Sequence, residues 1–236
     1  MNLERVTITG ADDSTNIDDL MALSHAFPFV EWGILVSPRQ EGSPRFPSRD
    51  WMCRFVAAAR EKANVNISTH ICGEWVRQLL VGDLSFFDSL PPVLSICKRI
   101  QINTHGEVHT STTGMWKSLE KFGDREFIFQ WDDVNDHLAY AAGTLFKRSI
   151  LFDTSHGAGV EPKEWKPAPD LFRCGYAGGI GPDNVLRHLE AISRVCGKPF
   201  WIDMERKVRT PDDSALDMNA VRRVIELSKQ FMESTW

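Results

Sequence analysis

The stretch CGYAGGIGPDNV, residues 174–185, carries the strongest local signal in the sequence. A short run of strand character ends in Gly178 and Gly179, and Gly-Pro-Asp-Asn follows before a helical pattern over 182–195. Pro182 suits the first turn of a helix, where its missing N–H costs no hydrogen bond. Two glycines at such a handover meet the needs of a tight turn. They also form an anion site when bare backbone N–H groups face a ligand at a helix N-terminus.

Seven other runs of strand length lie on either side of this stretch. They are rich in β-branched and aromatic residues, as strands are. Together with 172–177, the predicted strands cover 6–9, 30–36, 65–69, 99–103, 126–131, 149–153 and 199–203. Amphipathic segments fall between them, and the predicted helices cover 16–27, 48–63, 74–81, 111–121, 134–147, 182–195 and 216–233.

This alternation predicts the fold class. Strands that alternate with helices form a parallel sheet, and eight such units in 236 residues predict a closed barrel. We therefore expect an α/β protein with one (β/α)₈ TIM-barrel domain over residues 1–236. The spaces before the fourth and seventh strands are irregular, and a doubly wound open sheet is the alternative.

Composition narrows the class of protein. A net charge of -5 argues against nucleic acid as the main partner, because phosphate backbones are bound by clustered positive charge. The five cysteines are odd in number and include no C-x-x-C pair, which favours reduced thiols over a disulfide framework. Residues 1–20 lack the apolar segment of a secretory signal, and no apolar run is long enough to cross a membrane. We expect a cytoplasmic protein without a membrane partner, a cofactor or a resident metal.

Polar residues close nearly every predicted strand. In a barrel of this class the carboxyl ends of the strands carry the chemistry, although strands of any fold leave the core at their ends. Asp153 and Asp203 follow strongly apolar runs, and loss of water there raises the pKa of a carboxyl toward the range useful for proton transfer. The other strand ends are Thr9, Ser37, His70, Asn103, Gln130 and the Gly178–Gly179 pair.

Several separated segments resemble phosphoribosylanthranilate isomerase, a barrel enzyme of tryptophan biosynthesis. The closest is AGGIGPDNV (177–185), similar to that family's Gly-Gly-(Leu/Ile)-x-Pro-x-Asn-Val segment. WGILVSPRQEGSPRFPS (32–48) resembles its second strand and loop, SILFDTSHGAGV (149–160) its sixth strand, and WIDMERK (201–207) its eighth. The resemblance implies a barrel of the phosphate-binding type, with phosphate at Gly178 and Gly179.

The same resemblance assigns further roles. Arg45 matches the family's loop arginine near the substrate, Asp153 its general acid, and Asp203 the Val-Asp position. The sequence departs from the family in two places. Thr9 stands where the family has the cysteine base, and residues 204–209 read Met-Glu-Arg-Lys-Val-Arg in place of a loop that binds phosphate through its backbone. The fold therefore carries over more directly than the reaction.

Other side chains extend the predicted site. Arg206, with Lys207 and Arg209, replaces the missing phosphate loop or is a solvated surface loop. Asp12 or Asp13 supplies the missing base, or both belong to a helix entry that Ser14 or Asn16 caps. His156 follows Asp153 closely and is a candidate acid or base. We assign Arg39, Arg45, His70, Gln130 and Asp203 to substrate binding.

These features predict acid/base isomerase or lyase chemistry on a small anionic or phosphorylated molecule. The parent substrate of the resembled family is not required, because the base is replaced by Thr9. Two alternatives remain. One is a barrel without catalytic activity that binds a ligand or a partner protein. The other is metal-assisted hydrolysis by histidine and aspartate at the strand ends, since imidazole and carboxylate suit zinc, iron or manganese.

Overall fold

Eight parallel strands close into a barrel in chain order. The computed structural model describes residues 2–62, 64–104, 106, 108–132, 134–153 and 158–234. β1 pairs with both β2 and β8, which closes the sheet, confirms the predicted barrel and rules out the open sheet. The strands are β1 (Leu3–Thr9), β2 (Val30–Val36), β3 (Asn66–Ile71), β4 (Arg99–Ile102), β5 (Glu126–Trp131), β6 (Arg148–Phe152), β7 (Arg173–Ala177) and β8 (Phe200–Met204).

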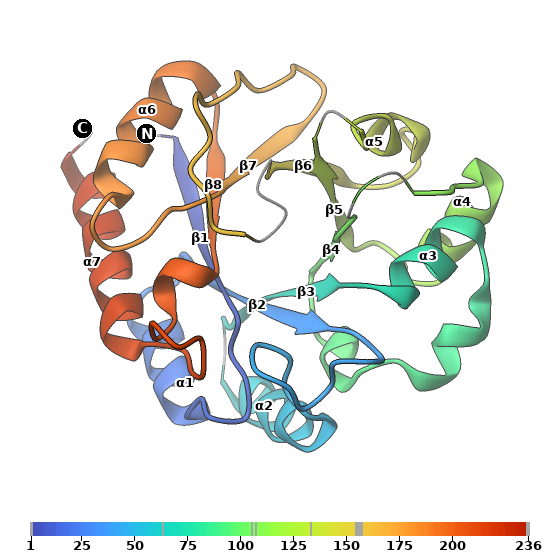
Figure 1. The fold of residues 1–236 in the computed structure, drawn as a ribbon, viewed down its shortest axis with the longest axis horizontal. Helices are drawn as coiled ribbons and strands as arrows, with labels where there is room; N and C mark the ends of the chain where they lie inside the picture. Colours follow the sequence, from blue (N-terminus) through green and yellow to red (C-terminus); the bar gives the residue numbers. More distant parts are fainter. Residues whose placement is uncertain are drawn as a thin grey trace.

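Helices surround the barrel on its outside (Figure 1). Two of the predicted starts are confirmed by their caps. Asn16 accepts a hydrogen bond from the backbone of Asp18, and Ser48 accepts one from Trp51. The α-helices are α1 (Ile17–Ala26), α2 (Arg49–Glu61), α3 (Glu74–Val81), α4 (Thr112–Glu120), α5 (His137–Ala141), α6 (Val185–Cys196) and α7 (Met218–Ser234), with 3₁₀ turns η1 (Leu84–Ser89), η2 (Pro92–Ser95) and η3 (Arg206–Val208).

The outer ring is incomplete between β5 and β7. The helix predicted over 134–147 is reduced to the five residues of α5, because a turn precedes it and Gly143, at a φ of 69°, follows it. Within the described residues 158–172, an irregular segment replaces a helix between β6 and β7 (Figure 1). Aromatic side chains cover the barrel there, with the rings of Trp165 and Tyr176 5.7 Å apart and those of Tyr140 and Phe172 5.1 Å apart.

A buried ionic layer fills the barrel near the amino ends of the strands. The fully buried Glu31 of β2 pairs with Arg5 and Arg99, each at 2.7 Å, and Thr7 donates a third hydrogen bond to it. The Arg99 guanidinium lies 4.1 Å from the ring centre of Trp201. This layer occupies the barrel interior at the amino ends of the strands, opposite the carboxyl ends.

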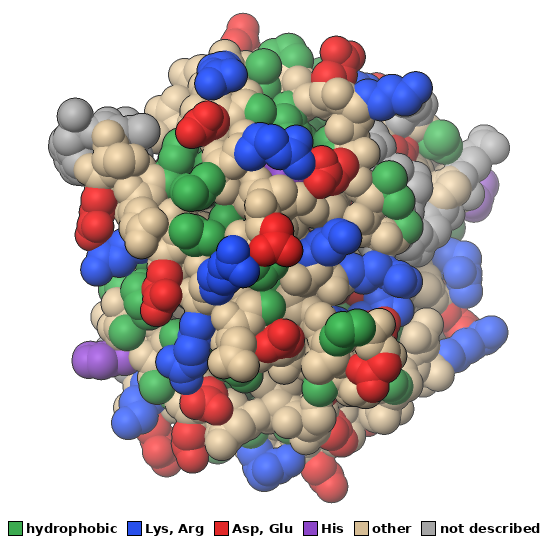
Figure 2. All heavy atoms as spheres, turned by 60° about the vertical axis from the view of Figure 1, so that its left-hand side comes forward, with side chains coloured by type: hydrophobic (Ala, Val, Ile, Leu, Met, Phe, Trp, Pro, Cys, Tyr) green, Lys and Arg blue, Asp and Glu red, His purple; other side chains and the backbone are tan. Residues whose placement is uncertain are grey.

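The outer surface carries charges of both signs. On the face that includes α6 and α7, acidic and basic side chains are interspersed (Figure 2). Among the described residues, no helix is long and apolar enough to cross a membrane.

Candidate active site

A cavity of about 400 Å³ opens at the carboxyl ends of the strands. Every strand except β1 contributes lining residues from its end or from the loop that follows. The polar and charged side chains in the lining are Ser37, Gln40, Arg45, His70, Gln101, Asn103, Gln130, Asp153, Asp203, Glu205, Arg206 and Lys207. Eight of the residues predicted from strand ends, including Gly178 and Gly179, therefore meet in one place.

Asp203 of β8 lies in the inner wall of this cavity. Its side chain is buried, and its Oδ1 accepts a 2.7 Å hydrogen bond from the Thr9 hydroxyl of β1. Burial raises the pKa of Asp203 to about 8, and the nearby carboxylates of Glu205 and Asp153 add to the rise. The Thr9 bond acts in the opposite direction but does not offset the loss of water. Asp203 thus keeps its proton at neutral pH and can donate it.

Asp153 follows β6 and faces the same cavity. Its Oδ2 lies 3.3 Å from Nε2 of Gln130, which projects from the neighbouring strand β5. The negative charge of Asp153 contributes to the raised pKa of Asp203, so the two carboxyls interact across the cavity. Two carboxyl groups in different surroundings can divide the acid and base roles of a proton-transfer reaction.

His70 of β3 adds a neutral imidazole to the cavity. Burial lowers its pKa to about 3, so the ring is uncharged at neutral pH. Nδ1 lies 3.3 Å from Nε2 of Gln101, an arrangement that favours the tautomer with the proton on Nε2. Nε2 is buried and has no hydrogen-bond partner in the described part of the chain. This atom is closed to solvent and lies beside Gly33, inside the barrel.

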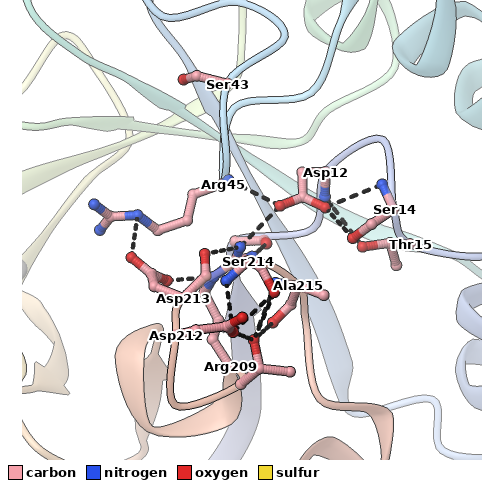
Figure 3. A network of polar contacts seen from close by, with 12 residues as sticks. Asp12, Ser14, Thr15, Ser43, Arg45, Arg209, Asp212, Asp213, Ser214 and Ala215 are labelled. Carbon is pink, nitrogen blue, oxygen red and sulfur yellow. Dashed lines mark hydrogen bonds and ion pairs between the residues drawn. The ribbon is translucent and has the colours of Figure 1, made fainter.

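Arg45 lies on the rim, in the loop between β2 and α2. Its Nη1 is 2.6 Å from Oε1 of Glu205, and its Nε is 3.3 Å from Oδ2 of Asp213. The backbone of Arg45 has a φ of 74°, which is uncommon outside glycine, and its N–H donates to Asp12 at 2.9 Å. The buried Arg209 binds Asp12 and Asp213 in turn (Figure 3). This network fixes the Arg45 guanidinium beside the cavity.

Gly178 and Gly179 line the cavity after β7 with φ values of 118° and 64°. A side chain on either residue would collide with the chain at residues 160–162, so close packing also requires glycine here. The predicted helix start is wrong by a few residues. α6 begins at Val185, and Asn184 holds the preceding turn by bonding Gly179 O and Gly181 N. Pro182 therefore lies in a turn and not in the first helical turn.

Two cationic side chains complete the glycine side of the cavity. Arg206 and Lys207 follow β8 directly, are exposed and line the opening. Arg206 packs close to Gly159, and Lys207 packs close to Gly181. Glycine backbone that lines the cavity, together with two positive charges, forms a region suited to an anion. We call this region, made of Gly178, Gly179, Arg206 and Lys207, the anion corner.

Three predicted residues do not join this group. Arg39 is exposed and pairs with Glu74 at 3.0 Å, outside the cavity lining. Asp12 lies in the Arg45–Arg209 network, where Arg45 and Ser14 lower its pKa against the effect of burial, and it does not line the cavity. Arg39 and Asp12 both lie in loops, and the strand pattern of the sequence does not specify the direction of a loop. His156 lies outside the described residues.

Sequence reasoning missed Glu205 and Gln101. Glu205 is two residues beyond Asp203, and alternate residues of an extended chain share a face, so this spacing was the available signal. Thr9 was read as a lost base, whereas its hydroxyl binds Asp203. As for metals, the described residues contain no group of three His, Cys, Asp or Glu side chains arranged to hold one.

Comparison with known proteins gives similarity in structure alone. No family model matches the chain, and no curated protein matches it in sequence. TrpF from Jonesia denitrificans, a phosphoribosylanthranilate isomerase, superposes with a TM-score of 0.59 at 15% identity, over 95% of this chain and 96% of that one. DAHP synthase from Thermotoga maritima gives a TM-score of 0.56 at 15% identity, over 99% of this chain and 70% of that one. A 3-hexulose-6-phosphate synthase gives 0.50 at 8% identity, over 94% and 99%.

These similarities confirm that the fold resembles phosphoribosylanthranilate isomerase. At such identities they show a shared barrel and leave the reaction to be argued from the cavity itself.

Proposed function

We propose that this protein is an acid/base isomerase or lyase for a small phosphorylated molecule. The observation that carries the proposal is Asp203, a buried carboxyl with a pKa raised to about 8 inside an open cavity. Such a group is protonated at neutral pH and close enough to its pKa to release the proton during a reaction. A purely structural carboxyl in a buried position is instead paired with a cation.

The anion corner supports a phosphorylated substrate. Gly178 and Gly179 follow β7, Arg206 and Lys207 lie just beyond the neighbouring β8, and all four line the same cavity as Asp203 of β8. The structural neighbours fit this proposal, because the names of two of them contain a phosphorylated compound. One is a phospho-2-dehydro-3-deoxyheptonate aldolase, and the other is a 3-hexulose-6-phosphate synthase. A cavity of about 400 Å³ holds a molecule the size of a sugar phosphate.

The chemistry that follows is proton transfer at a carbon beside a carbonyl or an imine. With the phosphate in the anion corner, Asp203 donates its proton to the oxygen or nitrogen that becomes electron-rich. A second group removes the proton from carbon. Neutral polar side chains such as His70, Gln101 and Gln130 are placed to hold the hydroxyl groups of the substrate.

The test is turnover by purified wild-type protein. Phosphoribosylanthranilate is the first substrate, followed by its fluorescence, and a panel of phosphorylated aldoses and ketoses in D₂O follows by proton NMR. Asp203→Asn should lower kcat about a hundredfold or more, since it cannot donate a proton from the same position. Asp124→Asn, at a fully exposed carboxyl far from the cavity lining, is the matched control and should keep wild-type activity.

Two outcomes would contradict the proposal. Turnover that survives in Asp203→Asn would remove Asp203 from the reaction. Tight binding of phosphorylated compounds by a wild-type protein that neither converts nor exchanges any of them would favour the barrel that binds a ligand without catalysis.

A further inference from the structure

Glu205 is a second carboxyl of β8 that faces the cavity, and the proposed function leaves it without a role. It stands two residues after Asp203, and both line the same space. Glu205 is half-buried, whereas Asp203 is buried. The two carboxyls therefore present one deep and one shallower group to the same bound molecule.

Glu205 forms an ion pair with Arg45 at the rim of the cavity. Within the described residues, Arg45 is the hydrogen-bond donor to this carboxylate, at 2.6 Å. Burial and the negative charges of Asp153 and Asp213 raise the pKa of Glu205, and Arg45 acts against them. Among the described residues, the titratable and charged groups around Glu205 are Cys72 after β3, Asp153 after β6, Asp203 of β8, Arg45, Asp213 in the loop before α7, and Arg209, which packs with Glu205 against Gly10.

We propose that Glu205 is the catalytic base that works opposite Asp203, and that Arg45 keeps it unreactive until an anionic group of the substrate draws Arg45 away. This inference rests on the proposed function and supplies its missing base. Arg45 is exposed by about a quarter at the rim, so an incoming anion can reach its guanidinium. Once Arg45 pairs with that anion, Glu205 loses its compensating charge and gains affinity for a proton.

The step balances in protons and electrons. Glu205 takes a proton from the carbon next to the carbonyl or imine, and the electron pair of that C–H bond becomes a C=C bond. The π pair of the C=O or C=N bond forms the new bond to the proton that Asp203 gives up. Glu205 ends protonated and Asp203 ionised. In the second half, Glu205 returns its proton to the former carbonyl or imine carbon, where the C=C pair forms the new C–H bond. The hydroxyl on the carbon that was deprotonated gives its proton to Asp203 as its O–H pair becomes the new C=O bond, and this restores both groups.

The first part of the test measures charge and not turnover. Protein labelled with ¹³C at the side-chain carboxyls of Asp and Glu is titrated by NMR, with and without 2-phosphoglycolate as a probe that carries both a phosphate and a carboxylate. In the wild type the probe should raise the pKa of Glu205. In Arg45→Gln the pKa should already be higher without the probe, and the probe should add no further rise. A Glu205 titration that does not respond to the probe overturns the proposal.

The second part measures exchange of the substrate carbon-bound proton for deuterium with the best phosphorylated compound of the panel. Glu205→Gln, which keeps an oxygen for Arg45, should lose exchange about a hundredfold or more. It should bind 2-phosphoglycolate at least as tightly as the wild type, because the probe then draws Arg45 away from a neutral amide and not from a carboxylate. Glu205→Asp should retain part of the exchange. Glu233→Gln, an exposed change on α7, should keep all of it.

The two proposals fail in different ways. A wild type that exchanges no compound of the panel overturns the proposed function and this inference with it. A wild type that exchanges while Glu205→Gln exchanges at the same rate overturns the assignment of Glu205 alone.

Discussion

Two carboxyls buried in the same barrel each accept a hydrogen bond from a threonine of β1, yet they differ in charge. The carboxylate of Glu31 accepts a hydrogen bond from Thr7 and pairs with Arg99 and Arg5. These two arginines keep the pKa of Glu31 low despite its complete burial. The carboxyl of Asp203 accepts a hydrogen bond from Thr9 but pairs with no cation among the described residues. Burial raises its pKa to about 8. A hydroxyl alone does not replace the water that a buried carboxylate loses, whereas a guanidinium does.

The difference in pKa between Glu31 and Asp203 matches their places at opposite ends of the barrel. At the amino ends, Glu31 is a permanent ion that holds three strands together through Arg5 and Arg99. At the carboxyl ends, Asp203 carries a proton that it can exchange. Substitutions around Glu31 and around Asp203 test this difference, and the largest effect is expected at the ionic layer.

Removing Arg99, one of the two cations that pair with Glu31, should cause the largest loss in the free energy of unfolding. Arg99→Met leaves a fully buried carboxylate with one arginine in place of two, and breaking a buried ion pair typically costs about 3–5 kcal/mol. The free energy of unfolding in urea measures the loss. Arg194→Met, which breaks an exposed pair on α6, is the control and should cost about 0–1 kcal/mol. Equal losses for the two variants would contradict the structural role of the ionic layer.

The pH dependence of stability should separate Asp203 from Glu31. The folded pKa of Asp203 lies above its ordinary value of 3.8, so its contribution is complete below that pH and is lost as the pH rises to about 8. Asp203→Asn should remove this loss and become more stable than the wild type by a few kcal/mol at pH 8 and above. Parallel stability curves for the two proteins between pH 4 and 9 would contradict the raised pKa.

The lowered pKa of Glu31 has the opposite sign, and its contribution is lost as the pH falls below 4.5.

The smallest effect is expected from the threonine hydroxyls. Thr9→Val removes the bond that lowers the pKa of Asp203, so that pKa should rise further, by up to about one unit for a bond worth about 1 kcal/mol. The alkaline limb of the activity profile would move to higher pH by the same amount. Thr7→Val is the matched change at Glu31, where two arginines still hold the charge and the alkaline limb should stay in place.

Most of the fold was predictable from the sequence. All eight predicted strands are present, because each buries a short β-branched or aromatic run between turn residues. The helix over 134–147 was predicted too long, since amphipathic spacing continues past the point where Gly143 ends α5. The irregular space predicted before β7 contains the proline-rich segment 162–169, and the described residues 158–172 form no helix there.

The candidate site was predictable where strands deliver the residues. His70, Gln130, Asp153, Asp203 and the glycine pair all reach the cavity. Residues in loops were less predictable, because a loop's direction depends on tertiary contacts. Asp12 belongs to the network that supports Arg45, and Arg39 turns to Glu74. The Glu31–Arg99 pair was not predictable from the sequence, because its partners lie 68 residues apart.

The central claim is that Asp203 holds a proton at neutral pH, and its titration in the ligand-free wild type tests this most directly. Carboxyl ¹³C signals are recorded from pH 3 to pH 10, and Asp203→Asn identifies the signal that belongs to Asp203. The structure predicts a midpoint near pH 8. A midpoint near the ordinary value of 3.8 would contradict the claim, because Asp203 would then be ionised at neutral pH and unable to act as the acid.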